Sequence, residues 1–364
     1  MKLPGFLLTL VLSYGASSLH ADDTFHVYAP SRESNTLWII SATPSEDNID
    51  LKTVEKVDLG FSAATITAHP EKPLLYLASN RSEENGVTPG AAIRLDEGGK
   101  KSEIIPFPLI HGYSYISLDR KNRFLLGANY SNGNVDVYAL SEDDVPWKTV
   151  AKLDEGRKNA HCVLTSPDNR SIYIPYVKDT NALYQYSFES ETGKISPLKP
   201  LNANPPEGTG PRHLAYHPSL PVLYFSNEQS LGVSAYRRAE SGHLTLLQVC
   251  DITGQEAPAE GVSSSDIVIT PDGKYLFAGI RGHKHDFDWI SRYGIMEDGK
   301  IKHLGLTPAD KIPWGLALSP DGKYLLATGF EAGTLMAYQI EDGGNLKRVG
   351  TLQWDKKISD LITR

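Results

Sequence analysis

Short apolar runs recur along the chain, and a tight polar turn precedes each of them. Three of the turns are nearly identical, reading SPDNR, TPDGK and SPDGK. Proline, aspartate and glycine are the residues that tight turns require. The runs that follow, such as VLYFSN and YLLATG, are rich in residues that favour β-strands. The turns repeat about every 50 residues. Their central positions are Pro70, Arg120, Pro167, Pro218, Pro271 and Pro320.

Two further strand-like segments follow each apolar run. The first often ends in tyrosine, as at Tyr138 and Tyr236, and the second is more polar. Each repeat therefore has four strands in about 50 residues. One strand precedes the turn, the apolar strand follows it, and the two further segments complete the set. That repeat is typical of a β-propeller blade. The pattern predicts an all-β protein built from four-stranded antiparallel blades, with no long amphipathic helix.

The ends of the chain predict how the ring closes. Residues 25–29, 36–40 and 53–58 offer three strands but no innermost one, and residues 358–363 can supply it. Shared strands close a ring without leaving an exposed edge. We therefore predict a single seven-bladed β-propeller over residues 22–364, closed by its N- and C-terminal strands. The alternative is a six-bladed ring with both terminal segments outside it.

The first 21 residues differ from the rest. Lys2 precedes a short apolar core at residues 6–12, and small residues follow at 17–21. This order is typical of a secretory signal peptide. We expect an exported protein, periplasmic or secreted, that does not bind a membrane. The alternative is that this segment remains attached as an uncleaved membrane anchor.

Charge and cysteine content exclude some classes of function. The 364 residues carry a net charge of −8, and no run rich in lysine and arginine is present, so we expect no nucleic-acid partner. Cys162 and Cys250 are the only cysteines and form no metal-ligand spacing. We predict two unpaired thiols, no cofactor and no metal.

One stretch, GTGPRHLAYHPSLPVLYFSNE, suggests where the chemistry lies. It forms a hairpin in which Arg212 opens the first strand and Glu228 follows the second, so both lie at the end opposite the turn. The equivalent residues of the other repeats should surround the channel mouth on the same face, and the N-terminal blade adds Arg32. The residues six before each turn position are Ala64, Ser114, His161, Arg212, Ser265 and Trp314. The residues ten after it are Asn80, Tyr130, Val177, Glu228, Arg281 and Phe330.

This predicted rim has the residue types of an anion-handling site. Arginines bind carboxylates and phosphates, and His161 and Glu228 are suited to acid–base catalysis. The alternative is a polar lining of a water-filled channel. We interpret His213 and His217 as structural, because they alternate away from the rim or lie at a turn. The stretch HKHDFD at residues 283–288 resembles a two-metal motif but lacks the helical scaffold that such a motif needs.

Four stretches resemble consecutive blades of a known family. They read NAHCVLTSPDNRSIYIPYV, GPRHLAYHPSLPVLYFSNE, SSSDIVITPDGKYLFAGIRGH and PWGLALSPDGKYLLATGF. They are similar to the lactonase family of seven-bladed propellers, which includes 6-phosphogluconolactonases of the cycloisomerase type and carboxymuconate lactonizing enzymes. PRH with the downstream NE is the most specific part of the resemblance. The chain departs from the family in its exported character and in a longer loop after Arg281.

The resemblance implies a function for the rim. It implies that His161, Arg212, Glu228 and Arg281 are catalytic. We expect the substrate-binding residues to be Arg32, Asn80, Tyr130, Ser265 and Trp314.

The leading hypothesis is a metal-independent lactonase that acts on a small anionic sugar-acid lactone, as a monomer or homodimer. Glu228 or His161 would activate water, and Arg212 and Arg281 would stabilise the developing charge. The alternatives are a cycloisomerase that forms a lactone and a non-catalytic exported binding propeller.

Overall fold

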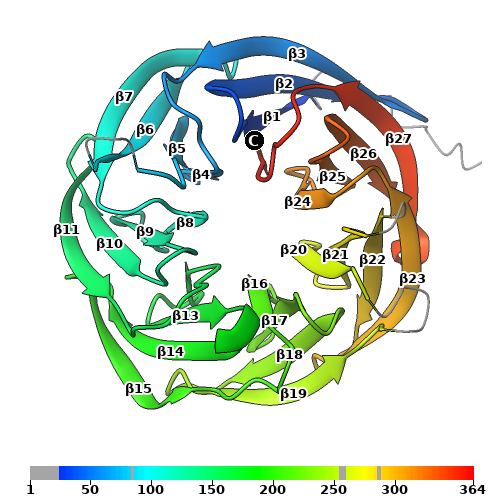
Figure 1. Ribbon diagram of the computed structural model, residues 1–364. Coiled ribbons are helices and arrows are strands. Elements are labelled where there is room, and N and C mark those ends of the chain that lie inside the picture. Colours follow the sequence, from blue (N-terminus) through cyan, green and yellow to red (C-terminus); the bar gives the residue numbers. More distant parts are fainter. Residues whose placement is uncertain (1–23, 83–85, 254–259, 285–287) are drawn as a thin grey trace, which may run out of the picture.

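Seven four-stranded antiparallel sheets stand around a central axis (Figure 1). The computed structural model describes residues 24–82, 86–253, 260–284 and 288–364. The seven-bladed prediction is confirmed, and a six-bladed ring is excluded. The predicted signal peptide lies outside the described residues. Within the part of the chain that is described, no helix is both long enough and apolar enough to cross a membrane.

The first four blades follow the chain, except that blade 1 takes its innermost strand from the C-terminus. Blade 1 consists of β28 (Ile362–Thr363), β1 (Phe25–Pro30), β2 (Thr36–Pro44) and β3 (Ile49–Asp58). Blade 2 consists of β4 (Thr65–Ala68), β5 (Leu74–Ala78), β6 (Thr88–Leu95) and β7 (Lys101–Leu109). Blade 3 consists of β8 (Tyr115–Leu118), β9 (Phe124–Ala128), β10 (Val135–Leu140) and β11 (Pro146–Leu153). Blade 4 consists of β12 (Leu164–Thr165), β13 (Ser171–Tyr176), β14 (Ala182–Glu189) and β15 (Lys194–Asn202).

The last three blades have the same order from the axis outward. Blade 5 consists of β16 (Pro211–Tyr216), β17 (Val222–Asn227), β18 (Val233–Arg238) and β19 (Leu244–Cys250). Blade 6 consists of β20 (Ser263–Ile269), β21 (Tyr275–Arg281), β22 (Asp288–Ile295) and β23 (Ile301–Ala309). Blade 7 consists of β24 (Pro313–Leu318), β25 (Tyr324–Gly329), β26 (Thr334–Ile340) and β27 (Leu346–Gln353). The described residues also include two short 3₁₀ turns, η2 (Lys178–Thr180) and η3 (Asp342–Gly344).

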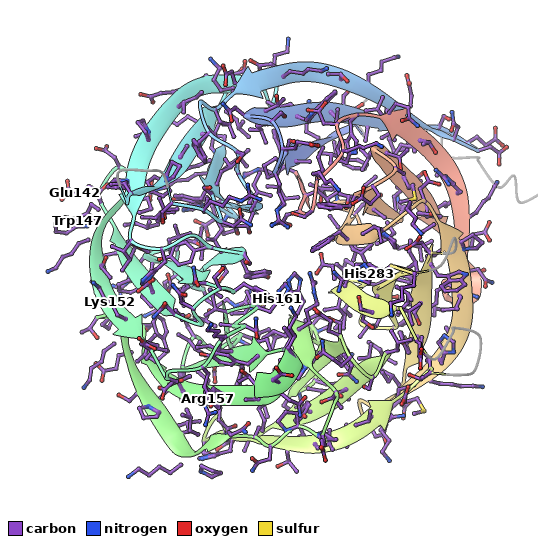
Figure 2. All side chains as sticks on the ribbon, in the orientation of Figure 1. Glu142, Trp147, Lys152, Arg157, His161 and His283 are labelled. Atoms are coloured by element: carbon purple, nitrogen blue, oxygen red, sulfur yellow. The ribbon has the colours of Figure 1, made fainter. Side chains whose placement is uncertain are left out.

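The second strand of each blade lies in the core between neighbouring blades. β13, β17 and β25 are buried at every position. Apolar side chains of adjacent blades meet there; Val27 and Ile40 of blade 1, for example, share a cluster with Leu326 of blade 7. The outer strands face solvent: Trp147 on β11 is 66% exposed. Figure 2 shows it at the periphery and His161 near the axis. Burial on both faces explains why the apolar runs show no polar alternation.

The repeated turns have a specific hydrogen-bond pattern. In the SPDGK turn, the Ser319 hydroxyl donates to Asp321 Oδ1 at 2.6 Å, and the same oxygen accepts the amide of Lys323 at 3.1 Å. Gly322 has φ of +72°, a conformation that glycine adopts without strain. The equivalent Gly273 also has φ of +72°. The recurring Asp-Gly pair is therefore structural and marks the face opposite the predicted rim.

The C-terminal segment closes the ring, as predicted. β28 pairs with β1 of blade 1. Asp360 reaches blade 2, where its Oδ2 accepts the hydroxyl of Thr65 at 2.9 Å and the amide of Ile66 at 3.0 Å. Ile358 and Leu361 are 0% and 3% exposed. Burial raises the pKa of Asp360 to about 7. The segment thus joins the first two blades near the axis (Figure 1).

The two cysteines are free, which confirms the prediction of unpaired thiols. Cys162 lies just before β12 and is fully buried, and burial raises the pKa of its thiol to about 12. A buried thiol with such a pKa is unreactive. Cys250 ends β19 and is partly exposed. Both residues therefore contribute to packing.

Removing residues 356–364 should destabilise the whole propeller. The truncation removes β28, exposes an edge of blade 1 and leaves the sites of Ile358 and Leu361 empty. Two such side chains contribute about 1.5–3 kcal/mol each, so the melting temperature of a chain of this size should fall by roughly 4–8 °C. Thermal denaturation followed by circular dichroism measures this, with Lys356→Ala at an exposed position as control. A truncated chain that melts with the control would contradict closure by the C-terminal strand.

Candidate active site

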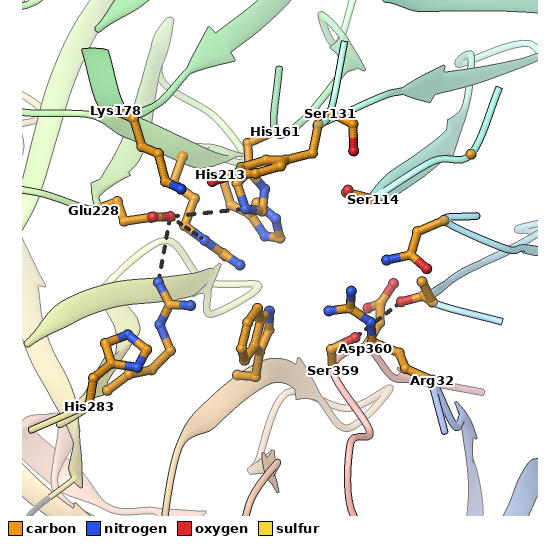
Figure 3. Close-up of a pocket in the computed structure, with 17 residues that line it drawn as sticks. Arg32, Ser114, Ser131, His161, Lys178, His213, Glu228, His283, Ser359 and Asp360 are labelled. Carbon is orange, nitrogen blue, oxygen red and sulfur yellow. Dashed lines mark hydrogen bonds and ion pairs between the residues drawn. The ribbon is translucent and has the colours of Figure 1, made fainter. Parts of the chain in front are cut away.

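A polar pocket of about 580 Å³ lies at the end of the blades opposite the SPDGK-type turns (Figure 3). Every blade contributes at least one residue to its lining. Eight of the nine residues predicted as catalytic or substrate-binding line it. They are His161, Arg212, Glu228, Arg281, Arg32, Asn80, Tyr130 and Trp314.

Ser265 is the ninth, and the prediction that it lines the pocket is wrong. Its hydroxyl donates to the carbonyl oxygen of Pro313 in blade 7 at 2.6 Å, and the residue is fully buried. Ser265 therefore links two blades. Two other residues assigned to the rim, Val177 and Phe330, do not line the pocket either; Val177 is fully buried, and Phe330 faces an adjoining cavity.

β-Bulges on three inner strands explain which side chains reach the pocket. On β16, Pro211 pairs with Asn227 and Leu214 with Phe225, so Arg212 and His213 together stand opposite one residue. The same irregularity occurs on β20 and β24. A bulge breaks strict alternation and redirects a side chain. The interpretation of His213 as pointing away from the rim is therefore wrong: it lines the pocket beside Arg212.

An ion cluster forms the wall between blades 5 and 6. Glu228 Oε2 lies 3.0 Å from Arg212 Nε and 3.5 Å from Arg281 Nη2, and 4.0 Å from His161 Nε2 (Figure 3). Arg212 is 0% exposed and Arg281 4%. One carboxylate therefore faces two buried guanidinium groups. The cluster retains an excess of positive charge in a place of low dielectric constant.

The two guanidinium groups have unused hydrogen-bond donors. Arg212 Nε faces Glu228, but among the described residues Nη1 and Nη2 of Arg212 have no hydrogen-bond acceptor, nor has Nε of Arg281. Arg281 Nη2 donates to the carbonyl of Ser264 at 2.7 Å. The ring of Trp314 lies 4.7 Å from Arg281 Cζ and 5.8 Å from Arg212 Cζ. Burial lowers the pKa of both arginines. Since buried donors without acceptors are costly, this arrangement favours an incoming anion.

Two imidazoles lie side by side in the pocket. The ring of His161 lies 4.9 Å from that of His213 and 5.3 Å from that of Tyr130. Burial and, next, the charge of Arg212 lower the pKa of both histidines, that of His161 well below 6.5. Both imidazoles are therefore neutral near pH 7 and can accept a proton.

Sequence reasoning also missed Lys178 and His283, which line the pocket. Lys178 directly follows the predicted rim residue Val177, and its ammonium nitrogen lies 5.4 Å from the centre of the Tyr130 ring. His283 Nε2 lies 2.8 Å from the Ser263 hydroxyl oxygen. A one-residue tolerance in the rim positions would have found Lys178.

The stretch at residues 283–288 is only partly visible, because residues 285–287 lie outside the described part. Asp288 is buried on β22, and its Oδ1 accepts the amide of Gly282 at 2.7 Å. Within the described ranges, no three His, Cys, Asp or Glu residues lie close enough together to hold a metal ion.

Comparison with known sequences identifies the family. Residues 20–358 match the profile of the lactonase family described as a 7-bladed beta-propeller. The chain belongs to this family. Two relatives are named 6-phosphogluconolactonase, one from Enterobacter sp. (strain 638) and one from Klebsiella pneumoniae (strain 342). The chain is 30% identical to the first over 324 residues and 31% identical to the second over 323, and each match covers 86% of this chain and 91% of the relative.

Solved structures show the same architecture as this lactonase-family propeller. The periplasmic gluconolactonase of Pseudomonas aeruginosa superimposes with a TM-score of 0.81 at 18% sequence identity. The match covers 93% of this chain and 99% of the other. At that identity the likeness concerns the fold.

Glu228→Gln should destabilise the protein, because Arg212 and Arg281 are buried and would lose their carboxylate. Breaking a buried ion pair costs about 3–5 kcal/mol. Chemical denaturation measures the loss. The matched control is Glu331→Gln, whose partner Lys357 is partly exposed and whose loss should cost less than about 1 kcal/mol. Equal losses in the two variants would show that the cluster is not a buried ion network.

Proposed function

We propose that the pocket hydrolyses the lactone of a sugar acid without a metal ion. The observation that carries this proposal is the pair of buried guanidinium groups, Arg212 and Arg281, that share one carboxylate and keep free donors beside neutral imidazoles. Membership of the lactonase family and the names of the relatives support it. Their names provide the substrate class: 6-phosphogluconolactone or gluconolactone.

Lactone hydrolysis makes two electrostatic demands on a site. As water attacks the carbonyl carbon, negative charge develops on the carbonyl oxygen, and preorganised donors stabilise it. Arg212 and Arg281 meet this demand, because their positions are fixed by Glu228 before substrate arrives. The product is a carboxylate, which the same two groups can bind in bidentate fashion.

Hydrolysis also requires a group that takes a proton from water. We assign this role to a pocket imidazole and not to Glu228. The carboxylate of Glu228 already forms ion pairs with two arginines, whereas the imidazoles are neutral. Glu228 then acts by holding the guanidinium groups in place.

The opposite wall of the pocket suits the polyhydroxylated part of the substrate. Arg32 lies there (Figure 3), and the lining also includes the amide of Asn80 and the aromatic rings of Tyr130 and Trp314. Arg32 Cζ lies 5.8 Å from the Trp314 ring centroid. Amide and guanidinium donors bind hydroxyl and anionic groups, and an aromatic face packs against the C–H face of a sugar. We propose that these four residues bind substrate. We also propose that the protein acts outside the cytoplasm.

A direct assay tests the proposed activity. The purified protein should hydrolyse glucono-δ-lactone or 6-phosphoglucono-δ-lactone faster than the spontaneous reaction, and EDTA should leave the rate unchanged. A pH-stat records the acid that is released. No acceleration with either lactone would contradict the proposal, and loss of activity in EDTA that added metal restores would contradict the metal-free mechanism.

Arg281→Ala should lower kcat/KM for the lactone by roughly 10²–10³-fold, as removal of an oxyanion donor does. A raised KM would indicate binding of the ground-state anion, and a lowered kcat would indicate contact with the oxyanion. Arg237→Ala is the matched control, because Arg237 lies on the surface and donates to the carbonyl of Asp298. Similar kcat/KM values for the two variants would show that Arg281 does not contribute to catalysis or substrate binding.

A further inference from the structure

His213, which lines the pocket, forms a histidine–carboxylate pair with Asp266. His213 Nδ1 lies 2.8 Å from Asp266 Oδ1. The bulges on β16 and β20 bring the two side chains together from neighbouring blades. Their side chains are 12% and 15% exposed. The pair is therefore largely shielded from bulk water. A hydrogen bond is stronger in such a low-dielectric environment than in water.

The backbone fixes the carboxylate of this pair. Asp266 Oδ1 accepts the amide of Ile267 at 2.8 Å, and Oδ2 accepts the amide of Leu316 in blade 7 at 2.9 Å. Burial opposes its ionisation, but His213 and these two amides outweigh burial and lower the pKa of Asp266. An ionised, immobile carboxylate orients the imidazole that it binds.

This geometry determines the tautomer of His213. A carboxylate accepts a hydrogen bond, so Nδ1 carries the proton and Nε2 carries the lone pair. Nε2 has no partner among the described residues, and His213 lines the pocket. The rings of Tyr115 and His161 contact the imidazole edge to face, with ring centroids 5.0 and 4.9 Å away.

His161 lacks a comparable orienting group. Its nearest carboxylate oxygen, on Glu228, lies 4.0 Å from Nε2, beyond hydrogen-bond distance, and is paired with two arginines. His161 Nδ1 has no partner among the described residues. Of the two imidazoles, only His213 therefore has a base–orienter arrangement of the kind found in catalytic triads.

We infer that His213, oriented by Asp266, is the general base of the site. This inference rests on the proposed lactone hydrolysis. His213 Nε2 takes a proton from water as the water oxygen bonds to the lactone carbonyl carbon, and the carbonyl π electrons move to its oxygen, facing Arg212 and Arg281. When the tetrahedral intermediate collapses, the ring C–O bond breaks and Nε2 returns the proton to the ring oxygen. The products are a hydroxyl group and a carboxylic acid, which loses its proton to solvent.

The groups that face His213 determine the pH range of this base. Burial and then Arg212 lower the pKa of His213, and Asp266 and Glu228 oppose this. The residues around the ring that bear on its charge are Arg212, Asp266, Glu228, His161 and Tyr115. Because a base acts when unprotonated, kcat/KM should fall as pH drops through this lowered pKa, on the acid side of 6.5.

Histidine variants test the assignment through the pH profile. His213→Gln should lower kcat by roughly 10²–10⁴-fold with little change in KM and should abolish the acidic limb of kcat/KM. His161→Gln should retain that limb. His243→Gln is the matched control, because His243 lies at an outer-strand turn and contacts the carbonyl of Lys199. An acidic limb that persists in His213→Gln and disappears in His161→Gln would overturn the inference and make His161 the base.

Asp266→Asn tests the orienting role separately from folding. An amide can donate to Nδ1 and so place the proton on Nε2, which removes the base. A comparable substitution in serine proteases lowers kcat by about 10⁴-fold. Activity should fall by at least about 10²-fold, and nitrogen NMR of histidine-labelled protein should show His213 changing from the Nδ1–H to the Nε2–H tautomer. A folded Asp266→Asn protein with wild-type kcat, or a wild-type His213 in the Nε2–H form, would overturn the inference.

Assays of the wild-type protein distinguish failure of the proposed function from failure of the assignment of the base. If it hydrolyses neither lactone, the proposed function fails, and the inference fails with it. If it is active and His213→Gln keeps wild-type kcat and pH profile, the function stands and the assignment of the base is wrong. Thermal denaturation of each variant identifies loss of activity that comes from unfolding.

Discussion

Closure of the ring is the constraint on which the site depends. Every blade contributes to the pocket, so no blade contains the site alone. The inner strands can converge only if the sheet array has no gap, and β28 fills the last position by pairing with β1. Asp360 extends this connection into blade 2 through Thr65 and Ile66. The geometry of a pocket built by residues far apart in the chain is thus a consequence of one short terminal strand.

Within the closed ring, unequal charge gives the pocket its chemistry. Two guanidinium groups, from Arg212 and Arg281, are buried around a single carboxylate. Their free donors favour an anion, and burial, together with the charge of Arg212, lowers the pKa of the neighbouring imidazoles and keeps them neutral. In the proposed reaction, one electrostatic arrangement would therefore both stabilise the oxyanion and leave a base available.

The fold was predictable because its signals are local and repeated. Turn residues such as Asp321 and Gly322 and the fully apolar second strands mark each blade, and the missing inner strand of the N-terminal unit indicates closure. Most of the pocket followed from equivalent positions at the end opposite those turns. The predictions that failed depend on tertiary structure. The bulge on β16 turns His213 into the pocket, and the hydroxyl of Ser265 instead bonds to the next blade. Strict alternation along a strand cannot reveal either.

The burial of the arginines was also hidden from the sequence. A rim was expected to be wet, yet neighbouring blades cover Arg212 completely. Whether this cluster is the catalytic centre is tested most directly by a crystal structure with a bound aldonic acid, the product of lactone hydrolysis. We expect the product carboxylate within hydrogen-bond distance of Arg212 and Arg281, with His213 Nε2 facing the hydroxyl that was the ring oxygen. A product bound in another cavity, or with its carboxylate directed away from both arginines, would contradict it.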